Sequence, residues 1–203
     1  MKRSRTRPPR ADNIREVLED LRRLSPTTAN HYHAAEAARL VYDKAQRLYL
    51  RFPQDSEASN AYFKVQKRYW QLIDEAYPPT FQQDLARLAE GDLSGMGSII
   101  AFLEADPIFD STGYLKEDLS RLLCKVGLPT NYIQRLQRVV LSIVDRRDGR
   151  EFRAFCRLAR KADGMELREG LTWRLANDDP NIRRRARWVL EALAQKDSME
   201  KHA

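Results

Sequence analysis

The chain has few of the residues that build most metal and nucleophilic sites. Its 203 residues include three histidines and two cysteines. His31 and His33 lie two positions apart, and on a helix this spacing sends the side chains to nearly opposite faces, which disfavours a shared metal ion. Cys124 and Cys156 each lie among apolar residues of predicted helices, so we expect small core residues rather than a disulfide or redox pair. No metal site and no catalytic constellation are therefore expected.

Long apolar runs and strand-like alternation are also absent. The apolar run at 139–144 is interrupted by Ser142 and is far too short to cross a bilayer. The basic N-terminus is not followed by an apolar stretch, so a secretory signal is not expected. No segment alternates in the manner of a β-strand. These features predict an all-α, cytoplasmic protein; in a eukaryotic source, the basic tail would also read as a nuclear-import signal.

Glycine is concentrated in one short segment, Gly91–Gly97. The segment lacks the Lys-Ser/Thr pair and the preceding strand that a phosphate-binding loop requires. The spacing of a nucleophile elbow is missing as well. We therefore interpret this segment as a flexible junction between helices, and we infer no cofactor and no small-molecule substrate.

Two long amphipathic segments follow a short helix predicted at 12–24. In each of them apolar residues recur at steps of four and three, which is typical of helices that pack along a seam. The turn at 53–55 joins them, which predicts a long antiparallel hairpin whose helices each span roughly 30 Å. Trp70 lies beside the second seam, where we expect packing in the core or between the hairpin and the rest of the protein rather than a ligand platform. The seam residues are Ala34, Ala38, Val41, Ala45, Leu48 and Phe52 in the first segment, and Ala58, Tyr62, Val65, Tyr69, Leu72 and Ala76 in the second.

After Pro78 and Pro79 the predicted helices become shorter. Connections of only a few residues make successive helices antiparallel neighbours. The predicted helices lie at 80–90, 93–105, 114–126, 130–146, 149–161, 165–177 and 180–195. We divide the chain into a disordered basic tail at 1–11, a helical hairpin module at 12–78, an array of short antiparallel helix pairs at 79–196 and a flexible tail at 197–203.

The last predicted helix pair has the most specific pattern in the chain. Asp179 is placed to cap a helix, and Pro180 suits the first helical position. Residues 165–195 resemble a HEAT-type repeat, which implies stacked helix pairs and, for Asp179 and Arg183, a structural link between neighbouring repeats. No second copy of the pattern occurs upstream. The resemblance is carried by Asp179, Pro180, Ile182, Arg183, Ala186, Leu190 and Leu193, by Val189 on the same apolar stripe, and by Leu167, Leu171 and Leu175 in the preceding helix.

Positive charge is concentrated at the two ends of the chain. The net charge is +7, and the first ten residues contain five bases and no acid. Residues 11–145 have sixteen bases and nineteen acids, whereas 146–196 have fourteen bases and eight acids. Basic ends of this kind suit an acidic protein surface or a nucleic-acid backbone.

Two binding functions therefore remain open. We favour a non-enzymatic helical scaffold or adaptor for a protein with an acidic surface, because the net charge outside the first ten residues is only +2. The alternative is a nucleic-acid-binding protein, in which Trp188 would stack on a base. No membrane partner is inferred. The candidate binding residues are Arg3, Arg5, Arg7, Arg153, Arg157, Arg183, Arg184, Arg187 and Trp188, with further bases at Arg146, Arg147, Arg150 and Arg160. Equally, these arginines could have no ligand and lie on a solvent-exposed helix face, where they form local ion pairs such as Arg187–Glu191.

A more remote alternative is an enzyme. Residues 181–184 faintly resemble the Asn-x-aromatic-x-Arg-Arg segment of HEAT-like DNA glycosylases. That resemblance implies a stacking surface from Trp173 and Trp188 and a carboxylate from Asp178. The aromatic residue of the family pattern is missing, because Ile182 directly follows Asn181, so no catalytic role is carried over.

Overall fold

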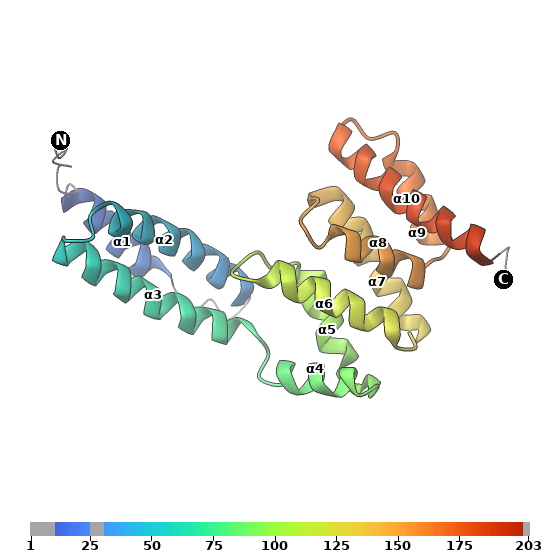
Figure 1. Cartoon of the computed structure of the whole chain (residues 1–203), viewed down its shortest axis with the longest axis horizontal. Helices are drawn as coiled ribbons and strands as arrows, with labels where there is room; N and C mark the ends of the chain where they lie inside the picture. Colours follow the sequence, from blue (N-terminus) through green and yellow to red (C-terminus); the bar gives the residue numbers. More distant parts are fainter. Residues whose placement is uncertain (1–10, 25–30, 201–203) are drawn as a thin grey trace, which may run out of the picture. The chain divides into compact units, whose positions relative to one another are not determined.

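The computed structural model describes residues 11–24 and 31–200. Within these ranges the fold is all-α, with ten helices, one short 3-10 turn and no strand, which confirms the predicted fold class (Figure 1). None of the described helices combines the length and the apolar character needed to span a membrane. The predicted binding residues Arg3, Arg5 and Arg7 lie outside the described residues.

The described residues form two compact units. The first contains the residues up to Pro78 together with Pro107–Asp110, and the second contains Pro79–Asp106 and the residues from Ser111 onward. Each unit has its own buried apolar residues.

The first unit is a long helical hairpin with one further helix. It consists of α1 (Ala11–Arg23), α2 (His31–Arg51) and α3 (Ser56–Ala76), and α2 and α3 pack against each other along their lengths (Figure 1). Asp55 caps α3, because its Oδ1 accepts a hydrogen bond from Ala58 N at 2.9 Å. The long antiparallel hairpin predicted from the apolar spacing is therefore confirmed.

Most of the buried apolar residues of α2 and α3 lie on the predicted seams. All six seam residues of α3 are buried, and Ala38, Val41 and Ala45 are buried on α2. Tyrosine rings fill the space opposite the small residues; Tyr42, for example, stacks on Tyr69 with ring centroids 4.7 Å apart. Trp70 is not a core residue, because 44% of this residue is exposed and its ring lies against Tyr69.

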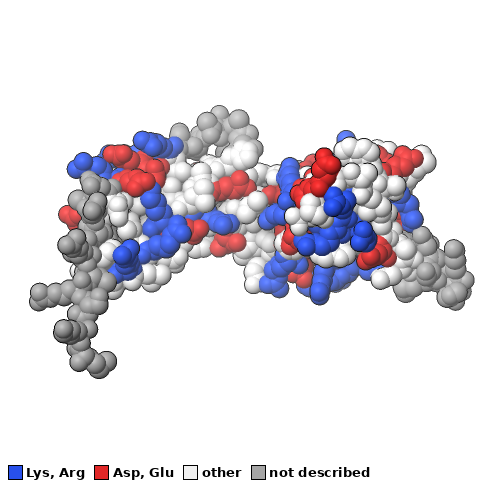
Figure 2. All heavy atoms as spheres, turned by 90° about the horizontal axis from the view of Figure 1, so that it is seen from above, with Lys and Arg blue, Asp and Glu red and all other residues white. Residues whose placement is uncertain are grey.

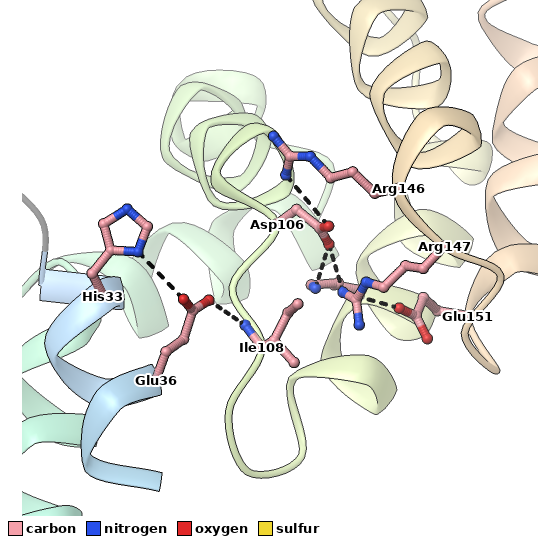
Figure 3. Close-up of polar contacts among 8 residues, drawn as sticks. His33, Glu36, Asp106, Ile108, Arg146, Arg147 and Glu151 are labelled. Carbon is pink, nitrogen blue, oxygen red and sulfur yellow. Dashed lines mark hydrogen bonds and ion pairs between the residues drawn. The ribbon is translucent and has the colours of Figure 1, made fainter. Parts of the chain in front are cut away.

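Glu36 of α2 holds the segment Pro107–Asp110 within the first unit. Its Oε1 accepts a hydrogen bond from Ile108 N at 2.8 Å, and its Oε2 lies 3.3 Å from His33 Nδ1 (Figure 3). Phe109 is buried among apolar residues of α2 and α3. His33 and Glu36 therefore share one helix face, as their spacing predicts.

The second unit is an array of helices that pack in antiparallel pairs, and all of them except α10 are shorter than α2 and α3. Its core includes large side chains that are fully buried, among them Phe81, Phe102, Leu119 and Phe155. The elements are α4 (Phe81–Ala89), the 3-10 turn η1 (Leu93–Gly95), α5 (Met96–Ala105), α6 (Thr112–Lys125), α7 (Thr130–Arg146), α8 (Phe152–Lys161), α9 (Met165–Arg174) and α10 (Pro180–Glu200). All seven helices predicted in this region are present, although α9 ends earlier and α10 ends later than predicted.

The final pair consists of α9 and α10, joined by the loop in which the helix cap was predicted. Asp179 Oδ1 accepts from Asn181 N at 2.8 Å, so the predicted cap is formed. Ala186, Val189 and Leu193 of the predicted apolar stripe have no exposed surface, whereas Ile182 and Leu190 of the same stripe are only partly buried. Leu175 departs from the prediction, because it follows α9 and is 37% exposed.

The glycine-rich segment is a close helix junction. Gly91 adopts a positive φ of 89°, which glycine permits without steric cost. At Gly95 an added Cβ would lie 2.5 Å from the backbone oxygen of Asp84, so only glycine allows this approach to α4. Asp92 caps η1 by accepting from Ser94 N at 2.9 Å. The segment joins α4 to α5 as predicted.

Candidate macromolecule-binding site

Arg183 is the first of the predicted binding residues on α10. Its side chain contacts the loop between α9 and α10. Its Nη1 donates to the carbonyl oxygens of Asn177 at 2.7 Å and Asp178 at 2.8 Å. These two bonds hold the connection between α9 and α10. Arg183 therefore has a structural contact within the last helix pair, and its guanidinium is not wholly available to a ligand.

Arg184 and Trp188 form a half-exposed pair one helical turn apart. The Arg184 guanidinium lies 5.1 Å from the centre of the Trp188 ring, and its Nη2 is 2.8 Å from Asp148 Oδ2. Trp188 remains 41% exposed and packs edge to face on Phe152, with ring centroids 5.9 Å apart. Arg187 is exposed and has no carboxylate partner among the described residues. The local pair with Glu191 considered from the sequence is not formed.

Arg185, to which the sequence analysis assigned no role, is the buried arginine of this helix. It is 4% exposed, and it donates from Nε to Val144 O at 2.6 Å and from Nη2 to Asp145 O at 3.3 Å. These carbonyls lie in the last turn of α7, where helix carbonyls have no intrahelical partner. The signal was present in the sequence, because Arg185 lies three residues after Ile182 and four before Val189, on the apolar stripe.

A buried charge cluster, defined by Asp106, Lys116, Arg147 and Glu151, uses several other bases of the second unit. Lys116 Nζ is 2.5 Å and Arg147 Nη2 is 2.8 Å from Asp106 Oδ1, and Arg147 also lies 3.4 Å from Glu151 Oε1 (Figure 3). Arg146 reaches Asp106 Oδ2 at 3.5 Å. Burial lowers the pKa of Lys116, although its hydrogen bond to Asp106 acts in the opposite direction. The cluster joins α6, α7 and the end of α5.

Arg150 is also held by side chains of α6. Its Nε lies 3.3 Å from Glu117 Oε2, and its guanidinium lies 3.9 Å from the centre of the Tyr114 ring. Together with Arg146 and Arg147, it belongs to the bases that the sequence suggested for tracking a nucleic-acid backbone. All three make ion pairs within the second unit.

A groove between α6 and α8 is lined by five basic residues of this unit. It has a volume of about 500 Å³, and no acidic residue lines it. We call it the basic groove, and its lining residues are Ser120, Arg121, Cys124 and Lys125 of α6 with Ala154, Arg157, Arg160 and Lys161 of α8. Figure 2 shows one face of the molecule, on which Lys and Arg gather over the second unit with fewer Asp and Glu among them.

Four of the five bases of the basic groove have no carboxylate partner in the part of the chain that the structure describes. These are Lys125, Arg157, Arg160 and Lys161. The fifth, Arg121, forms ion pairs with Glu117 and Asp118 of its own helix. An unneutralised cluster of this kind attracts anionic groups.

Burial raises the pKa values of both cysteine thiols, Cys124 in the basic groove and Cys156 on α8. Burial raises the pKa of the Cys124 thiol, and the positive charges of Lys161, Arg157 and Arg160 oppose that shift. Burial raises the pKa of Cys156 to about 11. Both are free thiols, and each is partly exposed rather than fully buried in the core. Because the thiolate is the reactive form, neither is an activated nucleophile.

The sequence identified one wall of the basic groove and missed the other. Arg157 lines the groove, while Arg153 is exposed on the same helix without lining it. Arg121 and Lys125 were not singled out, because the packing of α6 against α8 brings together segments that are far apart in sequence. A partial signal was available: Ser120 and Cys124, four residues apart, place small side chains on one face of a helix.

No contact in the structure assembles the residues of the glycosylase alternative into a site. Trp173 is 71% exposed, with the Arg174 guanidinium 5.8 Å from its ring centre, whereas Trp188 contacts Phe152 and Arg184. No group of three or more His, Cys, Asp or Glu side chains suited to a metal ion occurs within residues 11–24 and 31–200. In comparisons with protein families, curated proteins and solved structures, the chain matches none.

Proposed function

We propose that this protein is a non-enzymatic helical scaffold that binds an acidic surface of a protein partner through the basic groove. The observation that carries the proposal is the set of four bases, Lys125, Arg157, Arg160 and Lys161, that surround one groove without a described carboxylate partner. Stacked helix pairs commonly present such surfaces to partners, and the resemblance of α9–α10 to a HEAT-type repeat supports the same class of function. Complementary charge gives such a contact specificity and a fast association rate.

The distribution of the other bases favours a protein partner over nucleic acid. Binding along a phosphate backbone needs a continuous positive track. Beyond the basic groove, Arg146, Arg147, Arg150 and Arg184 are all paired with carboxylates. Of the candidate residues outside the groove, Arg153 and Arg187 are exposed without a described carboxylate partner, whereas four such bases line the groove together. The feature that favours nucleic acid is the Arg184–Trp188 pair beside the exposed Arg187.

Two matched double variants of the full chain separate these functions. Arg157→Ala/Arg160→Ala removes two positive charges from the basic groove, and Arg184→Ala/Arg187→Ala removes two from α10. The probes are a polyglutamate peptide, a single-stranded oligonucleotide and a duplex, each titrated at about 50 mM and about 200 mM salt.

The proposal expects polyglutamate binding that weakens with salt and that falls at least about tenfold in the groove variant. The α10 variant should bind this peptide as the parent chain does. Tighter binding of either nucleic acid, lost in the α10 variant, would instead establish the alternative. Absence of peptide binding at the lower salt concentration would overturn the proposal.

A further inference from the structure

A buried hydroxyl without a hydrogen-bond partner lies at the floor of the basic groove. Ser120 lines the groove and has no exposed surface, and its Oγ makes no hydrogen bond to any described residue. Most buried polar groups in proteins are hydrogen-bonded, because an unsatisfied one costs free energy. A serine hydroxyl can donate one hydrogen bond to an acceptor. The floor therefore suits a ligand oxygen and disfavours an apolar group.

Three bases of α8 lie around a second residue of the floor, Cys124. Burial raises the pKa of its thiol, and the positive charges of Lys161, Arg157 and Arg160 each oppose that rise. Charges affect a single thiol in this way only when they lie near it. Ser120 and Cys124 are four residues apart on α6 and share one helix face. The three charges are therefore close to the unpaired hydroxyl.

The charge and the burial of the groove favour one class of anionic group. Lys125 of α6 adds a fourth base without a described carboxylate partner, so the positive charge exceeds that of one Asp or Glu side chain. Ser120 and Ala154 are buried, so a group that reaches the floor must be compact. A phosphate monoester is compact, carries about −1.5 to −2 charges at pH 7 and has three strong acceptor oxygens. A carboxylate has two oxygens and one charge.

We infer that the basic groove binds a phosphorylated serine or threonine side chain of the protein partner. One phosphate oxygen accepts a hydrogen bond from Ser120 Oγ, and the other oxygens pair with the bases of α8. Because Ser120 has no exposed surface, groove side chains change rotamer as the phosphate enters, and long Lys and Arg side chains have that freedom. This inference rests on the proposed function and specifies the acidic group. Clusters of arginine recognise phosphorylated segments in the same manner.

Three peptides that differ at one position test this inference with the full chain. Each is rich in glutamate, and its central residue is phosphoserine, glutamate or serine. The proposed function expects all three to bind. The inference expects the phosphoserine peptide to bind at least about tenfold more tightly than the glutamate peptide, because of its higher charge and its third oxygen. Arg157→Ala/Arg160→Ala should remove this advantage.

The variant Ser120→Ala tests the floor hydroxyl without changing the charge. It should reduce the ratio of the phosphoserine and glutamate affinities at least about threefold, because alanine cannot donate to the phosphate. Removal of an unpaired buried hydroxyl should leave the melting temperature unchanged or raise it, so unfolding would not explain the loss. Ser98→Ala is the control, since Ser98 Oγ donates to Asp84 Oδ2 at 2.8 Å and does not line the groove. It should lower the melting temperature without changing the affinity ratio.

The outcomes separate the two proposals. Equal affinities for the phosphoserine and glutamate peptides would overturn the phosphate inference and leave the proposed function intact. An advantage of phosphoserine that persists in either groove variant, Arg157→Ala/Arg160→Ala or Ser120→Ala, would also overturn the inference. The same holds if a single-stranded oligonucleotide binds more tightly than the phosphoserine peptide and loses its affinity in Arg157→Ala/Arg160→Ala. Binding of none of the three peptides would overturn the proposed function and the inference together.

Discussion

Lys116 Nζ lies 2.5 Å from Asp106 Oδ1, and neither side chain has more than 2% of its surface exposed. Asp106 also has a positive φ of 46°, a conformation in which Asp and Asn are among the residues best tolerated. The carboxylate accepts from three basic side chains, of Lys116, Arg146 and Arg147. A buried pair of this kind adds little net stability by its presence, but removal of one partner leaves an uncompensated charge in the interior.

We expect Lys116→Met to destabilise the second unit by about 3–5 kcal/mol, because the substitution leaves the buried Asp106 without its closest cation. Urea denaturation followed by circular dichroism measures the free energy of unfolding. Lys125→Met is the control, since it removes an exposed lysine from the same helix and should change stability by about 0.5 kcal/mol or less. Equal effects of the two substitutions would show that the buried pair has no special role.

Arg185→Met should reduce the free energy of unfolding by at least about 2 kcal/mol. The methionine keeps much of the apolar stem but leaves the carbonyls of Val144 and Asp145 without their charged donor. Arg187→Met, two positions away on the exposed side of α10, is the matched control and should be nearly neutral. If the two variants melt at the same temperature, Arg185 does not stabilise the end of α7.

Gly95→Ala should destabilise the α4–α5 junction by about 1–3 kcal/mol, as overpacking does. The added Cβ would lie 2.5 Å from the backbone oxygen and 2.7 Å from the Cα of Asp84, and backbone atoms cannot rotate away. Gly97→Ala places its Cβ 3.4 Å from Tyr132 Oη inside α5. It should be neutral or stabilise by up to about 1 kcal/mol. Thermal denaturation of both variants checks the difference, and a loss of stability in Gly97→Ala of equal size would contradict the proposed cause.

The hairpin should lose stability at alkaline pH because buried tyrosines resist ionisation. Burial, with the charge of Asp110 as a second cause, raises the pKa of Tyr69 and of Tyr77 from 10.0 to about 12. A raised pKa in the folded state means that the stabilisation is complete below the unfolded value, pH 10.0, and is lost as the pH rises towards about 12.

Urea denaturation at several pH values measures this alkaline loss, with ultraviolet absorbance reporting tyrosinate formation. Tyr69→Phe should make the decline in stability above pH 10.0 shallower, because the phenylalanine has no proton to lose. Exposed Tyr114 is the control position, and Tyr114→Phe should leave the slope unchanged. An unchanged slope in Tyr69→Phe would exclude this tyrosine as a cause.

The helices and their apolar faces were predictable because they depend on local periodicity. All six seam residues of α3 are buried, and so are Ala186, Val189 and Leu193 of the α10 stripe, as their spacing indicates. The Asp179 cap was equally visible, since a cap depends on neighbouring residues. The exposure of Trp70 and Leu175 was not predictable, because periodicity alone does not say how far a neighbouring helix extends over the margin of an apolar face.

The candidate site was less predictable because charge pairing depends on contacts between distant segments. Asp106 and Arg147 are 41 residues apart in sequence, and their ion pair leaves Arg147 unavailable for the role that the sequence suggested. Arg185 and Arg187 are two positions apart in one arginine run, yet one is buried against α7 and the other is exposed. The arginine run is visible in the sequence, but the sequence does not show which of its arginines is buried and which is exposed.

The sequence by itself determined that this chain is all-α, that a long hairpin precedes shorter helix pairs, and where most helices begin and end, because propensity, capping and apolar spacing act over a few residues. Only the tertiary structure decided which positive charges are neutralised inside the second unit and which meet at one surface. The packing of α6 against α8 brings Lys125 and Arg157 to the same groove, because helix packing places side chains together according to the geometry of the interface and not according to their distance along the chain.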